Sequence, residues 1–104
     1  MYVEDKTLNI FVLADGEKIE KSCNEDDERF VIFTTRRILS GFWYYGLPRF
    51  SSVPYSSVIL WETSVSEDGV GIKLYLPDEN DKGYFFESTL GGEIDSILAS
   101  HVSK

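Results

Sequence analysis

The chain has 104 residues, of which 42% are hydrophobic and 14% aromatic, and its formal net charge is -8. This length suits one domain around a single hydrophobic core, and the apolar content excludes an intrinsically disordered chain. The acidity disfavours nonspecific binding to nucleic acid, because such binding depends on Lys and Arg displacing counterions from the phosphates.

The single cysteine, Cys23, has no second thiol with which to form an internal disulfide. No apolar stretch approaches the roughly 18 residues of a membrane span, and none follows a basic start as in a signal peptide. We therefore expect a protein of the reducing cytoplasm.

Residues 1–14 allow two interpretations. Leu8, Phe11 and Val12 follow helical spacing and predict a short helix, whereas the segment could equally be an extended arm. We separate this segment from the domain itself, which we expect over residues 15–104.

Most of the remaining chain alternates between β-rich runs and turns. The run Phe30–Phe33, four polar residues and the run Ile38–Tyr45 together predict a β-hairpin. Further strands are expected over residues 17–23, 49–53, 58–65, 70–76 and 84–87. In the first of these, Ile19, Lys21 and Cys23 should share one face, because side chains alternate along a strand. The pattern is typical of an antiparallel meander of about seven strands.

The spacing of the apolar residues changes near the C-terminus, from the alternation of strands to the spacing of a helix. The residues expected on the buried face of this helix are Leu90, Ile94, Ile97 and Leu98.

Several short phrases, in their order along the chain, resemble one known family. They are DGEKIEKS from Asp15, FVIFTTRRIL from Phe30, FSSVPYSSVILWE from Phe50 and GIKLYL from Gly71, followed by the amphipathic helix. Together they resemble the bacterial pleckstrin-homology-like (PH-like) domains. The resemblance implies a mainly β fold, a bent antiparallel barrel of about seven strands capped by one C-terminal helix. It also implies homo-oligomers and no catalytic machinery.

The residues themselves also argue against catalysis and metal binding. His101, the one histidine, lies near the C-terminus and has no nucleophile pattern around it. Cys23 has no nearby His or second Cys, as a zinc site would need, and the acidic run 25–28 lacks the glycine-punctuated spacing of a calcium loop. We expect no enzymatic activity, no metal and no cofactor.

The charge pattern distinguishes the middle of the chain. Residues 4–28 hold nine acids and three bases, and residues 62–95 hold nine acids and two bases, whereas residues 29–61 hold four arginines and no acid. The same window contains the aromatic run 42–45, which a small domain cannot bury completely. Because Trp, Tyr and Arg dominate the energetics of protein interfaces, this window is the predicted binding surface.

Because side chains alternate along a strand, one pair of aromatic residues in this run faces solvent and the other faces the core, and the sequence allows either arrangement. We expect Trp43 and Tyr45 to point outward and Phe42 and Tyr44 to point inward, although a bulge at Gly41 would exchange the faces. The predicted interface residues are Trp43, Tyr45, Leu39 and Phe50. The predicted function is a noncatalytic PH-like interaction module that self-associates or docks a protein partner through this surface.

The alternative function is binding of an anionic lipid headgroup at a membrane surface. Its phosphate ligands would be Arg36, Arg37, Arg49 and Lys73. The competing interpretation is that Arg36 points to water and that Arg37 pairs with a carboxylate or stacks on an aromatic ring. Peripheral membrane contact is therefore the second choice, after a protein partner or a second copy, and nucleic acid is not expected.

Overall fold

The computed structural model describes residues 13–26, 28–45, 47–86 and 91–102. The chain forms two compact units, Met1–Ser52 and Val53–Lys104. Most of the N-terminal segment, for which helix and arm were both open, lies outside the described residues.

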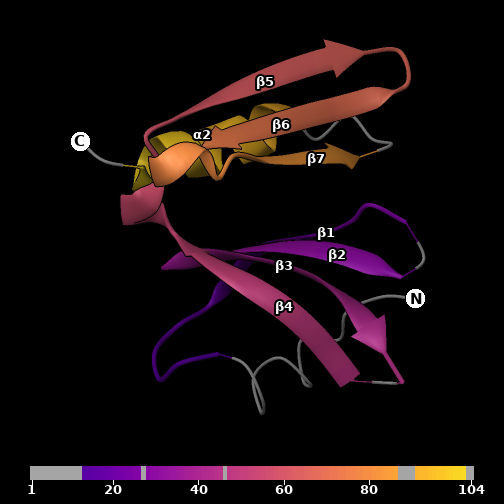
Figure 1. Ribbon diagram of the computed structural model, residues 1–104, viewed down its shortest axis with the longest axis vertical. Helices are drawn as coiled ribbons and strands as arrows, with labels where there is room; N and C mark the ends of the chain where they lie inside the picture. Colours follow the sequence, from indigo (N-terminus) through magenta and orange to yellow (C-terminus); the bar gives the residue numbers. More distant parts are fainter. Residues whose placement is uncertain (1–12, 27, 46, 87–90, 103–104) are drawn as a thin grey trace. The chain divides into compact units, whose positions relative to one another are not determined.

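The first unit is a four-stranded sheet whose strands follow one another along the chain (Figure 1). They are β1 (Ile19–Asn24), β2 (Arg29–Thr34), β3 (Arg37–Tyr44) and β4 (Leu47–Pro54), in the order β1-β2-β3-β4. β2 pairs antiparallel with both β1 and β3, and Val31 lies opposite Cys23 on one side and Ser40 on the other. Antiparallel neighbours need only short turns to connect them, which is why this sequence of runs and turns forms a meander. The predicted hairpin of β2 and β3 is confirmed.

Asp26 holds the turn between β1 and β2. Its Oδ1 accepts hydrogen bonds from the backbone N–H groups of Glu28 and Arg29, both at 2.9 Å, and its Oδ2 accepts one from Nε of Arg29 at 2.8 Å. Because these bonds favour the charged carboxylate, they lower the pKa of Asp26 to about 2. The acidic segment therefore stabilises a turn.

A hydrophobic cluster lies on one face of this sheet. It consists of Phe30, Ile32 and Leu39, with Leu13, Ile19 and Trp43 packed against it. Phe30 pairs with Gly41 and Ile32 pairs with Leu39, and directly paired residues share a face. The cluster is therefore a product of the β2–β3 register.

A β-bulge in β1 corrects one expectation. Phe33 and Thr34 are neighbours on β2, but their partners on β1, Lys21 and Ile19, are two positions apart. β1 therefore has one extra residue at this point. The extra residue reverses the alternation of side chains. Ile19 packs against the hydrophobic cluster, whereas Lys21 and Cys23 lie on the opposite face. The prediction that all three share one face is wrong.

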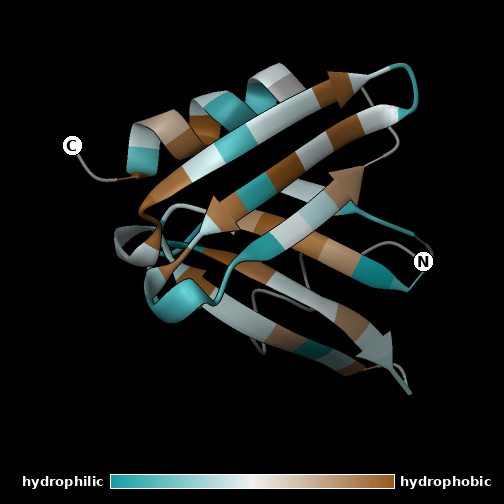
Figure 2. Ribbon diagram, turned by 45° about the horizontal axis from the view of Figure 1, so that its top comes forward, coloured by the Kyte–Doolittle hydropathy of each residue, from teal (hydrophilic) through white to brown (hydrophobic). Residues whose placement is uncertain are grey.

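The second unit contains a three-stranded antiparallel sheet and the C-terminal helix. Its elements are η1 (Tyr55–Ser57), β5 (Leu60–Ser66), β6 (Gly69–Tyr75), η2 (Pro77–Glu79), β7 (Lys82–Phe86) and α2 (Gly91–His101), with the strand order β5-β6-β7. In β6 the buried residues Val70, Ile72 and Leu74 alternate with more exposed ones, as the sequence predicted. Figure 2 shows hydrophobic bands alternating with more polar ones along the strands. The alternation gives this sheet one apolar face.

The helix α2 packs against β5 and is also tied to it by polar contacts. Oδ1 of Asp95 accepts a hydrogen bond from Nε1 of Trp61 at 2.7 Å and another from Oγ1 of Thr63 at 3.2 Å. Ile94 and Leu98 are buried, as predicted. Ile97, also expected on the buried face, is half-buried.

The described residues thus form seven strands in two sheets and one C-terminal helix, a mainly β fold as predicted. Leu90, which we expected on the buried helix face, lies outside the described residues. None of the helices in the described part of the chain is long and apolar enough to cross a membrane.

Candidate interaction surface

Exposed apolar side chains gather where β3 ends and β4 begins. Phe42, Tyr44 and Tyr45 are 42%, 45% and 90% exposed, and Leu47 is 65% exposed. Phe50, a predicted interface residue, is 38% exposed, but it follows Arg49 on β4 and so lies on the opposite face of the sheet from Arg49 and Tyr44. Scattered single apolar residues are ordinary on a protein surface, but a contiguous group is typical of an interaction site. We call the group formed by Phe42, Tyr44, Tyr45 and Arg49 the aromatic surface.

The members of the aromatic surface contact one another. The ring centroids of Phe42 and Tyr44 are 6.3 Å apart with their planes at 88°, and those of Tyr44 and Tyr45 are 4.5 Å apart with their planes at 78°. Cζ of Arg49 lies 4.5 Å from the centroid of the Tyr44 ring. Edge-to-face and cation–π contacts of this kind restrain the side chains, so less rotamer entropy remains to be lost when a partner binds.

The structure reverses the expected phase of this strand. Leu39 is fully buried, and the Trp43 ring packs against Phe30 with 6.0 Å between centroids. Phe42 and Tyr44, which we expected inside, are the exposed pair. The expectation that Leu39 and Trp43 are exposed is therefore wrong, although they do share a face as the alternation predicted.

The cause is what covers the other face of the sheet. Leu13 and Ile19 pack on the hydrophobic cluster that includes Leu39, and Trp43 joins them there. The β2–β3 register continues without a shift, so no bulge exchanges the faces. Tyr45 is exposed because it lies beyond the end of β3, where its φ is 50°. Tyr45 is exposed as we expected, but the alternation of side chains along a strand, on which the expectation rested, is not the reason.

Gly41 is a point of close approach between β3 and β4. A Cβ at this residue would lie 1.8 Å from the carbonyl oxygen of Arg49 and 2.6 Å from Cα of Phe50. These are backbone atoms that cannot move aside, so only glycine fits. The chain's own β4 occupies the space beside Gly41, which fixes the backbone of Arg49 next to β3.

Arg37 is held in a polar network around the buried carboxylate of Glu17. Its Nε and Nη2 donate to the two carboxylate oxygens of Glu17, both at 3.0 Å, and its Nη1 donates to Oγ of Ser52 at 3.0 Å. Glu17 also accepts hydrogen bonds from Oγ1 of Thr34 at 2.5 Å and from the N–H of Ala14 at 2.9 Å. This bidentate contact engages the N–H groups with which Arg37 would bind a phosphate. The interpretation that Arg37 pairs with a carboxylate is confirmed.

Glu17 is charged even though it is only 6% exposed. Burial by itself would raise the pKa of its carboxyl, but the hydrogen bonds from Arg37, Thr34 and Ala14 favour the charged form more strongly and lower the pKa to about 2. Sequence reasoning missed this residue, because nothing local distinguishes Glu17 among the 18 acidic residues. Only its contacts with the β2–β3 turn mark it.

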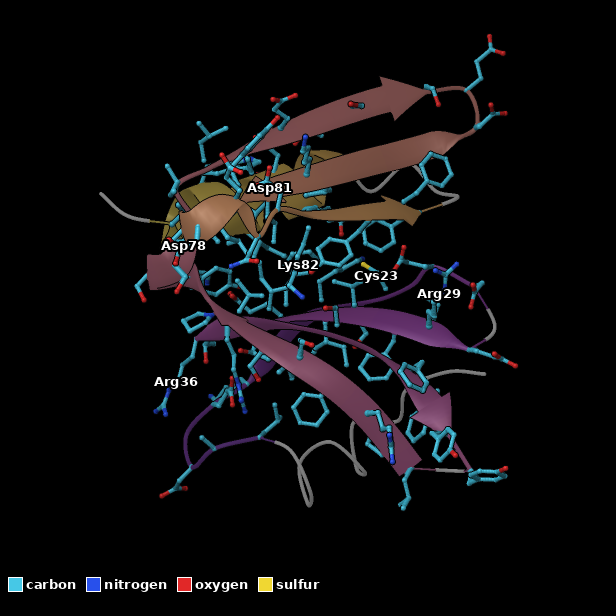
Figure 3. The ribbon with its side chains drawn as sticks, in the orientation of Figure 1. Cys23, Arg29, Arg36, Asp78, Asp81 and Lys82 are labelled. Carbon is cyan, nitrogen blue, oxygen red and sulfur yellow. The ribbon has the colours of Figure 1, made fainter. Side chains whose placement is uncertain are left out.

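The other three candidate phosphate ligands lie on different elements. Arg36 is exposed at the β2–β3 turn, where it points outward, and its Nη2 donates to the backbone oxygen of Asp15 at 3.1 Å (Figure 3). Arg49 belongs to the aromatic surface. Lys73 lies on β6, with its Nζ 4.8 Å from the centroid of the Tyr75 ring. Each of these cations contacts a partner within its own unit.

The remaining candidates for chemistry have structural surroundings. Within the described ranges, no three His, Cys, Asp or Glu side chains come together as metal ligands. His101 is half-buried and stacks on Tyr55, with 4.6 Å between centroids and 17° between planes. Cys23 is buried, and among the described residues it forms no disulfide.

Comparison with known proteins identifies the fold. No family model matches the chain, and no curated protein matches it by sequence. Among solved structures, it is similar to a DUF1696 family protein with a pleckstrin-homology domain from Shewanella loihica PV-4, with a TM-score of 0.69 and 17% identity over 94% of this chain and 92% of that chain. It is also similar to a pleckstrin homology domain from Shewanella amazonensis SB2B, with a TM-score of 0.67 and 17% identity over 93% of this chain and 96% of that chain. The chain therefore has the fold of bacterial PH domains, as its short phrases predicted.

Proposed function

We propose that this chain is a noncatalytic PH-like interaction module of the cytoplasm, which docks a protein partner or a second copy of itself through the aromatic surface. The observation that carries the proposal is the exposure of three aromatic side chains that contact one another at one end of the β3–β4 hairpin. Tyr and Arg are among the residue types that contribute most to binding free energy at interfaces. Their restraint before binding lowers the entropic cost of association.

The distribution of charge supports the same surface. All 18 acidic residues lie outside residues 29–61, and the aromatic surface lies inside that window. The aromatic surface itself therefore holds no acid, and an incoming protein meets like charge at its border, on the acidic β1–β2 turn, and not at the rings.

No observation favours the lipid-headgroup alternative in the same way. The guanidinium of Arg37 is already bound to the buried Glu17 carboxylate. The net charge of -8 also opposes approach to an anionic bilayer. Protein docking is therefore the better-supported function.

The test compares a double variant, Phe42→Ser with Tyr44→Ser, with the control Phe85→Ser. Phe85 on β7 is 45% exposed, close to the exposure of the two replaced residues, and lies outside the aromatic surface. If copies of the chain associate through this surface, light scattering should show that the double variant has a smaller mass than the parent and the control. If a different protein binds there, affinity capture from the native host should retain it with the parent and the control only.

A double variant that matches the parent in both mass and captured proteins would refute the proposed function. Circular dichroism melting should first show that all three chains unfold cooperatively, so that loss of binding is separated from loss of folding.

A further inference from the structure

The aromatic surface has a shape that suits one kind of partner. Its neighbouring rings stand at 88° and 78° to each other, so the surface is angled and offers successive ring faces and edges. Proline rings pack well on such faces, and a polyproline II segment presents them along a preformed helix with three residues per turn. Because both surfaces are ordered before they meet, little conformational entropy is lost.

The polar groups of the surface suit the same partner. Within the described residues, the hydroxyl groups of Tyr44 and Tyr45 make no hydrogen bond. A polyproline II segment has no internal hydrogen bonds, so its carbonyl oxygens are free to accept bonds from these hydroxyls. The backbone carbonyls of a partner α-helix are already engaged within the helix.

The two sides of the surface carry opposite charge. Arg29 lies opposite Phe42, but its guanidinium is paired with the Asp26 carboxylate at 2.8 Å. The N–H of Trp43 donates to the backbone oxygen of Glu28 at 3.0 Å, so the β1–β2 turn, in which acids outnumber Arg29, lies along one side. Arg49 lies on the other side, on β4, and among the described residues it has no ion pair. A complementary ligand therefore carries an acidic residue toward β4 and a basic residue toward the β1–β2 turn.

The spacing of these charges follows from the sheet. Two strand separations of about 4.8 Å each lie between β2 and β4, and a polyproline II helix rises about 3.1 Å per residue, so about three residues cover the distance. We propose, resting on the proposed function above, that the aromatic surface binds a proline-rich segment in the polyproline II conformation, with about three prolines between an acidic residue bound by Arg49 and a basic residue near Glu28.

The experiment measures binding of a fluorescently labelled Glu-Pro-Pro-Pro-Lys peptide by anisotropy. The parent and Phe85→Ser should bind it with equal Kd, and Tyr44→Ser should bind it at least about ten-fold more weakly. A peptide with Gly and Ser in place of the prolines should bind none of the three chains. Replacing the peptide's Glu by Gln should weaken binding to the parent by about three-fold and should leave binding to Arg49→Gln unchanged, since the ion pair is already absent there.

Equal binding of the Gly-Ser peptide, or binding that survives Tyr44→Ser, would overturn the inference. A Gln peptide that loses as much affinity for Arg49→Gln as for the parent would overturn the assigned ion pair. If the proline peptide does not bind while the double variant of the preceding section changes mass or captured proteins, this inference is wrong and the proposed function stands. If the double variant also matches the parent there, both are wrong.

Discussion

Glu17→Gln tests the buried network at the β2–β3 turn. Glutamine keeps the shape of the side chain but removes the charge that faces the guanidinium of Arg37 in the parent. The pKa of Glu17 is lowered from 4.5 to about 2, and each pKa unit corresponds to about 1.4 kcal/mol. We therefore expect the substitution to reduce the free energy of unfolding at neutral pH by about 3 kcal/mol, a large part of the roughly 5–15 kcal/mol of a small domain.

The pH dependence gives the sharper result. A carboxyl whose pKa is lowered by folding stabilises the protein above its unfolded pKa, and this contribution is lost as the pH falls toward its folded pKa. The difference between parent and variant should be constant above about pH 5 and should shrink between pH 4.5 and about 2. Asp26, whose pKa is also about 2, titrates in both chains, so its contribution cancels in the difference.

Urea unfolding followed by tryptophan fluorescence measures this difference at each pH. Glu67→Gln is the control, because Glu67 is exposed in the β5–β6 turn and its replacement should change stability by less than about 0.5 kcal/mol. The reasoning is refuted if Glu17→Gln costs no more than the control, or if its cost is the same at pH 7 and near pH 2.

Two further substitutions test the packing. Gly41→Ala should destabilise the β3–β4 hairpin by more than about 2 kcal/mol, because its Cβ would lie 1.8 Å from the carbonyl oxygen of Arg49; an unchanged melting temperature would contradict the close approach. Leu98→Asp should prevent folding or reduce the free energy of unfolding by at least about 4 kcal/mol, because Leu98 is fully buried. Ile97→Asp should reduce it clearly less, because Ile97 is half-buried. Circular dichroism melts that rank the two variants in the opposite order would refute the helix orientation.

Local signals in the sequence determined the elements. The β2–β3 hairpin follows from two β-rich runs around four polar residues, and β6 follows from strict alternation of Val70, Ile72 and Leu74. The period of the C-terminal residues predicted α2, and the order of the short phrases predicted the PH-like fold. These features depend on residues close together in the chain, so one sequence is enough to recognise them.

The candidate site depended on the sequence only in part. The interaction surface expected in the acid-free window stays a prediction; of its candidate residues, Tyr45, Arg49 and Phe50 are exposed. The orientation was not predictable, because alternation shows which residues share a face and leaves open which face is covered. In the structure, Leu13 and Ile19 cover the face of Trp43, and the bulge in β1 is what brings Ile19 there.

The partner of Arg37 was likewise decided by tertiary structure. Glu17 lies 20 positions earlier in the chain and carries no local mark of its role. Its carboxylate meets Arg37 and Thr34 because the pairing of β1 with β2 brings Glu17 next to the β2–β3 turn. The groups that surround a charged side chain in space determine its partner and its pKa, whereas the sequence shows only the residues that precede and follow it.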